Sequence, residues 1–211
     1  MTTDPVPIVL PAASGYVVLQ KGVESLPRDA GSVLLPIARA AIANELGIAR
    51  SAPEDEPWLK QHGASFITVT EAGKLRGCIG TLRPHRALAE DVRNNAVAAA
   101  FRDPRFRPLT APEFGAVSLE ISVLSALEAI AFTDERDALS QLRAGIDGVI
   151  FEYGHHSSTF LPQVWESFSE PADFLAQLKY KAGLPPDFWD DAVKLMRYTV
   201  AKWRETDRDW T

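Results

Sequence analysis

Residues 65–82, SFITVTEAGKLRGCIGTL, predict a β-hairpin, and a hairpin commits this part of the chain to antiparallel pairing. Two runs rich in β-branched and apolar residues flank the turn at 71–74, where Gly73 can adopt the positive φ that a tight turn requires. The segment 116–127, AVSLEISVLSAL, alternates apolar and polar residues, which is typical of a strand covered on one face. Both features favour antiparallel sheet.

Helical patterns lie among these strands without regular β–α–β alternation. The segment 87–101 consists of strong helix formers with an apolar stripe. The segment 29–48 has helical apolar spacing, with Ser32 as its expected N-cap and Pro36 tolerable only near the first turn. This mixture predicts an α+β fold with mainly antiparallel sheet. The other expected elements are helices at 137–145 and 171–184, a second hairpin over 147–164, and a tail at 193–205 whose pattern allows strand or helix.

The composition is that of a soluble globular protein. The chain has 211 residues, of which 46% are hydrophobic and 24% charged. A single cysteine excludes a disulfide framework and fits a reducing cytoplasm. The first residues lack a basic start, and prolines break their short apolar run, so we expect neither a secretory signal nor a membrane span. We expect residues 1–14 to form a poorly ordered arm.

Positive charge is concentrated in one window of an acidic chain. The formal net charge is −6, yet residues 74–107 hold eight basic and three acidic residues, which is +5 against −11 for the rest. The window predicts a local surface that attracts anions. Its shortness and the acidic remainder argue against nucleic acid as a partner. The basic residues are Lys74, Arg76, Arg83, Arg86, Arg93, Arg102, Arg105 and Arg107.

The lone thiol, Cys78, lies inside this window in the segment LRGCIG. In a regular strand Arg76 would project from the same face as Cys78, and a neighbouring cation lowers a thiol pKa. Gly77 and Gly80 leave the backbone open to a ligand or to another strand. Three interpretations stay open: a small packed core residue, a thiol that contacts a ligand, and a covalent nucleophile.

The residues around Cys78 offer ligand contacts and one general base. Arg76 and Arg83 could pair with a phosphate or carboxylate, with Thr81 and backbone N–H groups assisting; the alternative is an edge strand kept soluble by charge. Glu120, on the polar side of its strand, is the candidate general base. The four histidines show no metal-binding spacing, so we expect no metal site.

Six segments occur in an order and spacing that resemble the AMMECR1 domain family, whose bacterial and archaeal members are called AmmeMemoRadiSam system protein A. The likeness runs from about residue 34 to 205. It implies one domain, residues 15–211, made of two α+β lobes with a cleft onto which LRGCIG faces. It also implies a Memo-type protein and a radical S-adenosylmethionine enzyme as partners. The segments are LRGCIGTL, AVAAAFRDPRFRPLT, LEISVLS, GIDGVIFE, TFLPQVWE and FLAQLKYKAGL.

Two functional hypotheses follow, and neither names a cofactor. The first is an accessory or binding protein that holds an anionic small molecule, or a partner segment, in a cleft at LRGCIG. The alternative is an enzyme that uses Cys78 in RNA or nucleotide modification, with Glu120 as base. The expected ligand-binding residues are Arg76, Gly77, Cys78, Gly80, Thr81 and Arg83.

Overall fold

A computed structural model describes residues 26–207, so the arm expected at 1–14 lies outside the described residues. No helix among the described residues has both the length and the apolar character needed to cross a membrane. The α-helices are α1 (Gly31–Glu45), α2 (Leu88–Phe101), α3 (Glu135–Gln141) and α4 (Pro171–Lys181). The 3₁₀ turns are η1 (Pro57–Lys60), η2 (Ala111–Glu113), η3 (Pro162–Ser167) and η4 (Glu205–Asp207). The strands are β1 (His62–Gly63), β2 (Ser65–Glu71), β3 (Lys74–Gly80), β4 (Arg86–Ala87), β5 (Val117–Leu124), β6 (Glu128–Ala129), β7 (Gly148–Tyr153), β8 (His156–Phe160), β9 (Lys194–Tyr198) and β10 (Val200–Arg204).

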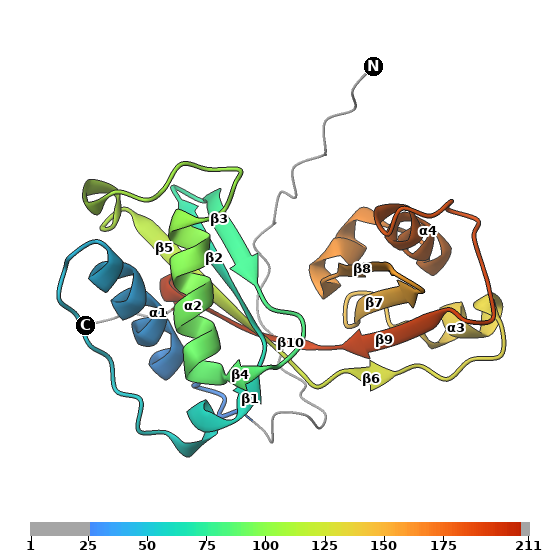
Figure 1. The fold of residues 1–211 in the computed structure, drawn as a ribbon, viewed down its shortest axis with the longest axis horizontal. Coiled ribbons are helices and arrows are strands. Elements are labelled where there is room, and N and C mark those ends of the chain that lie inside the picture. Colours follow the sequence, from blue (N-terminus) through green and yellow to red (C-terminus); the bar gives the residue numbers. More distant parts are fainter. Residues whose placement is uncertain (1–25, 208–211) are drawn as a thin grey trace.

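The strands form two four-stranded antiparallel sheets, which confirms the α+β class and the two lobes (Figure 1). The first lobe, residues 26–124 and 200–207, has the strand order β10-β5-β2-β3. The second lobe, residues 128–198, has the order β6-β9-β7-β8. A short β1–β4 ladder lies beside the first sheet. The tail whose pattern allowed strand or helix forms β9 and β10, one strand for each sheet.

Helices α1 and α2 cover one face of the first sheet and form its core with the buried residues of β2 and β5. The start of α1 differs from the expectation. Ala30 is its N-cap and makes no side-chain cap, while Ser32 lies inside the helix and donates its hydroxyl to the carbonyl of Asp29. Pro36 is tolerated within the helix. The second sheet packs on α4, where Trp165 and Phe174 stack with their ring centroids 3.7 Å apart.

The chain crosses between the lobes twice, from β5 to β6 and from β9 to β10. The two crossings are hydrogen-bonded to each other, since Ser125 donates its N–H to the carbonyl of Thr199 and Thr199 donates its N–H to Ser125 Oγ, both at 2.9 Å. A buried cluster drawn from both lobes lies next to them. Its fully buried members are Ala64, Leu124, Ile150 and Tyr198.

Strand β3 can lie directly on α2 only because residue 77 has no side chain. A Cβ on Gly77 would lie 2.0 Å from the carbonyl oxygen of Ala99 in α2. We expect Gly77→Ala to lower the free energy of unfolding by about 2 kcal/mol or more, because strand and helix must separate. Urea unfolding followed by circular dichroism measures this change.

Gly115→Ala is the matched control, because a Cβ there meets no heavy atom within 4 Å. Its stability should stay within about 0.5 kcal/mol of the unchanged protein. Equal stability of the two variants would contradict the close strand–helix contact.

Candidate functional site

A β-bulge in β3 determines which side chains stand beside Cys78. Consecutive residues of β2 pair with Gly77 and Leu75, so Arg76 is the extra residue of the bulge. A bulge shifts the alternation of side chains by one position. Leu75, instead of Arg76, therefore accompanies Cys78 on the face turned toward the second lobe.

This face borders a pocket of about 190 Å³ between the two lobes. The second lobe contributes the end of β8, the following turn and the last residue of α4. The walls are mostly apolar, with two cationic side chains and one amide among them. The lining residues are Phe66, Leu75, Cys78 and Arg105 from the first lobe, and Thr159, Phe160, Leu161, Gln163, Val164 and Lys181 from the second.

The Cys78 thiol lies half-buried in the wall of this pocket. Thr68 Oγ1 donates a hydrogen bond to Sγ at 3.4 Å, and Arg105 lies close enough to favour the thiolate. Burial outweighs both effects and raises the pKa of Cys78 above its usual value of 9.0. The thiol is therefore mainly protonated at neutral pH, which weakens it as a nucleophile.

The loop after α2 covers the open edge of β3 and brings Arg105 to the pocket. Asp103 Oδ2 accepts the N–H of Cys78 at 2.8 Å. The same carboxylate accepts two bonds from the Arg105 guanidinium, to Oδ1 at 2.9 Å and to Oδ2 at 2.7 Å, and a third from the Arg105 backbone N–H to Oδ1 at 3.1 Å. These bonds hold the pKa of Asp103 down at about 2, with the Arg105 contact as the largest cause. The cation beside Cys78 is thus Arg105, and Asp103 neutralises it.

Lys181 is the second cation of the pocket, on the opposite wall. Its Nζ donates to the carbonyl of Thr159 at 2.9 Å and lies 4.9 Å from the centroid of the Phe160 ring. The Lys181 side chain is exposed overall, but protein atoms around its ammonium remove part of the hydration and lower the pKa of Lys181. Among residues 26–207, no carboxylate forms an ion pair with it. Lys181 therefore contributes the net positive charge of the pocket.

Arg76 faces away from the pocket and holds the loop after α2. Its guanidinium donates to the carbonyls of Arg107 at 2.8 Å and Pro108 at 3.3 Å, and it pairs with Glu113 at 3.4 Å. The side chain is 10% exposed. The shared face expected for Arg76 and Cys78 is wrong because of the bulge.

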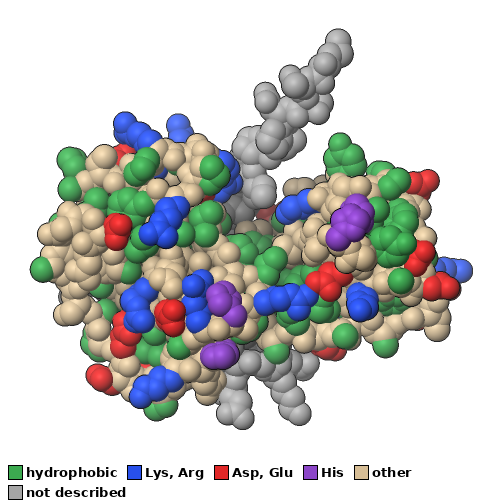
Figure 2. Space-filling view, viewed as in Figure 1, with side chains coloured by type: hydrophobic (Ala, Val, Ile, Leu, Met, Phe, Trp, Pro, Cys, Tyr) green, Lys and Arg blue, Asp and Glu red, His purple; other side chains and the backbone are tan. Residues whose placement is uncertain are grey.

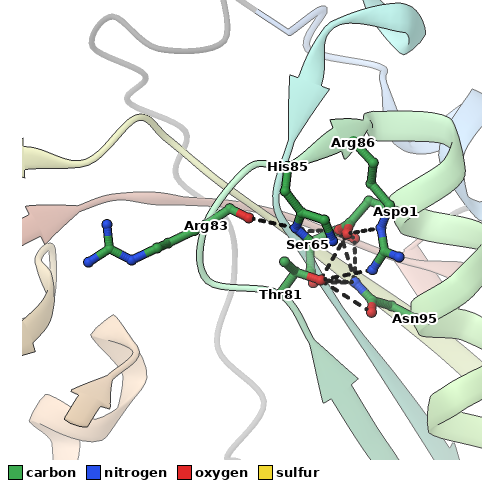
Figure 3. A network of polar contacts seen from close by, with 7 residues as sticks. All are labelled: Ser65, Thr81, Arg83, His85, Arg86, Asp91 and Asn95. Carbon is green, nitrogen blue, oxygen red and sulfur yellow. Dashed lines mark hydrogen bonds and ion pairs between the residues drawn. The ribbon is translucent and has the colours of Figure 1, made fainter. Parts of the chain in front are cut away.

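Thr81 belongs to a buried polar network at the start of α2 (Figure 3). The centre is Asp91, whose side chain is fully buried. It accepts hydrogen bonds from Ser65 N and Oγ at 2.8 and 2.7 Å, from Thr81 Oγ1 at 2.8 Å, from Arg86 Nε at 2.9 Å and from Asn95 Nδ2 at 2.9 Å. The network fixes the connection from β3 to α2, and neither Thr81 nor Arg86 lines the pocket.

Arg83 and Glu120 are both engaged in ion pairs. Arg83 is an exposed side chain that reaches across to Glu152 of the second lobe. Glu120 is buried on the same sheet face as Cys78 and pairs with Arg204 and, at 3.2 Å, with Lys202. Cys78, Thr68, Glu120 and Arg204 stand side by side across the four strands. Glu120 does not line the pocket.

Gly77 and Gly80 allow neighbouring residues to pack closely against the backbone of β3. Gly77 lies against Ala99 of α2, and a Cβ on Gly80 would lie 2.2 Å from the ring of Phe66. Of the six residues expected to bind ligand, only Cys78 lines the pocket.

Ion pairs neutralise most of the positive window. Arg76 and Arg107 share Glu113, Arg83 pairs with Glu152, and Arg93 pairs with Glu54. These acids all lie outside the window. Figure 2 accordingly shows Lys and Arg interspersed with Asp and Glu on the face drawn. No group of three or more His, Cys, Asp or Glu side chains suited to a metal ion occurs within the described part of the chain.

The sequence reasoning missed most of the second-lobe wall. Lys181, Phe160 and Leu161 carried no expectation. The signals were a lysine at the end of a helix, directly before AGL, and a proline that turns β8 into η3. Trp165 of η3 does not line the pocket: it is buried and donates its indole N–H to the carbonyl of Asp147 at 2.7 Å.

Two antiparallel lobes with a pocket at their junction define a two-lobed α+β protein. The chain matches the AMMECR1 family model over residues 35–203, through both lobes, and it belongs to the AMMECR1 family.

Relatives and a solved structure agree with this assignment. A protein of Sulfolobus acidocaldarius is 35% identical, covering 89% of this chain and 86% of its own. A protein of Methanothermobacter thermautotrophicus is 36% identical, covering 85% and 96%. The crystal structure of the uncharacterised protein PH0010 from Pyrococcus horikoshii is 34% identical, covers 84% of this chain and 92% of its own, and superposes with a TM-score of 0.74. None of these names states an activity.

Because burial raises the pKa of Cys78, alkylation should report a protonated thiol. We expect the iodoacetamide rate to rise with pH and to reach its half-maximum above pH 9. Thr68→Val removes the donor to Sγ and should move this midpoint higher still. Mass spectrometry of the single cysteine gives the rates, and the urea-unfolded chain is the control. A plateau reached below pH 8 would contradict the burial argument.

The depressed pKa of Asp103 predicts a loss of stability in acid. The ionised carboxylate stabilises the fold above its unfolded pKa of 3.8, and this contribution disappears as pH falls through about 2. The shift corresponds to about 2 kcal/mol. Asp103→Asn should therefore be less stable than the unchanged protein at pH 7, with the difference shrinking between pH 4 and 2. Urea unfolding across this range tests it.

Asp187→Asn, which removes an exposed carboxylate in the second lobe, is the control and should lose little stability at any pH. If the Asp103→Asn difference were independent of pH, the ion pair with Arg105 would not be its source.

Proposed function

We propose that this AMMECR1-family protein is a binding protein that holds an anionic small molecule, or an acidic segment of a partner, in the pocket between its lobes. The main observation that supports this proposal is the position of Lys181. Its ammonium stands on one wall of a largely apolar pocket, opposite Cys78, with no carboxylate partner among the described residues. A cation partly removed from water gains from an anion that enters beside it.

The origin of the lining residues supports this pocket over other surfaces of the chain. Four of the six segments that carry the family resemblance supply nine of the ten lining residues, and Phe66 is the exception. These segments lie far apart in sequence and meet where the lobes meet. A chance surface depression would not draw on them so selectively.

Binding is favoured over covalent catalysis by Cys78. The thiol is mainly protonated at neutral pH, and Glu120, the expected base, is paired with Arg204 and Lys202 outside the pocket. A nucleophilic cysteine is activated by a base within hydrogen-bonding reach or by a lowered pKa, whereas Thr68 only donates to the Cys78 sulfur and burial raises the thiol pKa.

The partners implied by the family resemblance, a Memo-type protein and a radical S-adenosylmethionine enzyme, fit the second form of this proposal. An acidic segment of either partner would place a carboxylate next to Lys181. Affinity capture with the unchanged protein and with Lys181→Met would test it, since a partner held through the pocket should be lost from the variant.

The experiment that tests binding uses the thiol as a reporter. The protein is incubated with nucleotides, phosphosugars, products of S-adenosylmethionine and simple carboxylates, while the melting temperature and the iodoacetamide rate of Cys78 are followed at pH 9. A ligand in the pocket should raise the melting temperature and slow the labelling at least threefold, because it covers the sulfur.

Lys181→Met keeps the apolar stem and removes the charge, so it should abolish both effects. Lys194→Met is the matched control: Lys194 is an exposed lysine of the same lobe, on β9, outside the pocket. Failure of every anion to protect Cys78, or equal protection in Lys181→Met, would overturn the proposal.

A further inference from the structure

We infer that the ligand of this pocket is a monoanionic carboxylate carried on an apolar group about the size of one amino-acid side chain. The inference rests on the proposed function and narrows its ligand class from anions in general. It follows from the charge of the pocket, the chemistry of its walls and its volume.

The charge of the pocket is close to one positive unit. Arg105 is paired with Asp103 through two hydrogen bonds, so this pair contributes no net charge, and Lys181 contributes one. Lys202 and Arg204 share Glu120 but do not line the pocket. A monoanion balances the charge, whereas a phosphate dianion would leave one negative charge next to apolar walls. Such an uncompensated charge costs free energy when water is excluded.

The thiol does not disturb this balance. A thiolate at position 78 would repel an incoming carboxylate across the pocket. Burial raises the pKa of Cys78, so its sulfur is neutral at pH 7 and forms part of the wall. Asp103, the carboxylate nearest to this wall, is held by Arg105 and by the N–H of Cys78.

The lining of the pocket favours a ligand that carries an apolar group. Five of the ten lining residues are apolar aliphatic or aromatic side chains from both lobes, and Gln163 adds one neutral amide. A small anion without an apolar group would leave these side chains in contact with water, so their burial would add no free energy to binding. The five are Phe66, Leu75, Phe160, Leu161 and Val164.

The volume limits the size of that body. A pocket of about 190 Å³ is smaller than the 300–1,000 Å³ common for drug-sized ligands. Water occupies about 30 Å³ in the liquid and a covalently bonded heavy atom occupies less, so the space suits roughly six to twelve heavy atoms. One phenyl or branched alkyl group with a carboxylate fits, and a nucleotide does not. The same chemistry occurs in a free aromatic acid and in the C-terminal residue of a polypeptide.

The test compares matched ligands by isothermal titration with the full chain. The first set is 3-phenylpropionate, its amide, phenyl phosphate and acetate, which vary charge and apolar body separately. We expect 3-phenylpropionate to bind at least tenfold more tightly than each of the other three, because only it supplies one negative charge and an apolar group. In Lys181→Met the acid should lose this advantage over its amide, and in Lys194→Met it should keep it.

The second set identifies the source of the carboxylate. A pentapeptide that ends in Phe with a free carboxylate is compared with its C-terminally amidated form and with 3-phenylpropionate. Tighter binding of the free-carboxylate peptide than of 3-phenylpropionate assigns the pocket to chain termini. The reverse order assigns it to small acids, and either order supports the inference. Equal binding of the two peptides would overturn it.

The outcomes separate this inference from the proposed function. If phenyl phosphate binds more tightly than 3-phenylpropionate and protects Cys78, the carboxylate class is wrong and an anion-binding pocket remains. If neither compound binds and no other anion protects Cys78, both proposals fail.

Discussion

The carboxylate of Asp103 is the group on which the geometry of the site depends. It accepts the N–H of Cys78, the backbone N–H of Arg105 and two hydrogen bonds from the Arg105 guanidinium, so one side chain joins the edge strand, the loop after α2 and the cation at the pocket. The outward backbone groups of an edge strand need partners, and here a side chain supplies them in place of another strand. Charge-assisted bonds of this kind are about twice as strong as neutral ones, and Asp103 is almost fully buried. These hydrogen bonds therefore fix strand β3, the loop after α2 and the Cys78 thiol relative to one another.

The sequence predicted the class of fold because its signals are local. The hairpin over 65–82, the alternation at 116–127 and the helix at 87–101 all depend on residues close together in the chain, and each forms as expected. Position 76 shows the limit of such reasoning. A bulge inserts one residue into β3, which no alternation pattern reveals, and it exchanges Arg76 for Leu75 on the face of Cys78. The expectation that Arg76 projects from the same sheet face as Cys78 is therefore wrong. The guanidinium beside the thiol belongs to Arg105.

The positive window was misleading for a related reason. Counting charges along residues 74–107 omits the acids that the fold brings to them from elsewhere in the chain. Glu54, Glu113 and Glu152 all pair with arginines of the window, two of them from the first lobe and one from the second. What distinguishes Lys181 is its surroundings: it lies outside the window, yet no described carboxylate pairs with it. A charge count in sequence measures composition, whereas attraction of an anion depends on the local balance in space.

The side of the first sheet that the helices do not cover carries buried polar and charged side chains. Glu120, Ser122 and Thr68 are buried on the side of the first sheet that the helices do not cover. Glu120 is stabilised there by its two cationic partners on β10. The second lobe, joined by two hydrogen-bonded crossings, forms the pocket together with Cys78 of the same sheet face. A buried carboxylate without such partners would destabilise the fold strongly. The charges of the polar row from Cys78 to Arg204 are thus balanced within the first lobe, and the pocket lies where the Cys78 end of the row meets the second lobe.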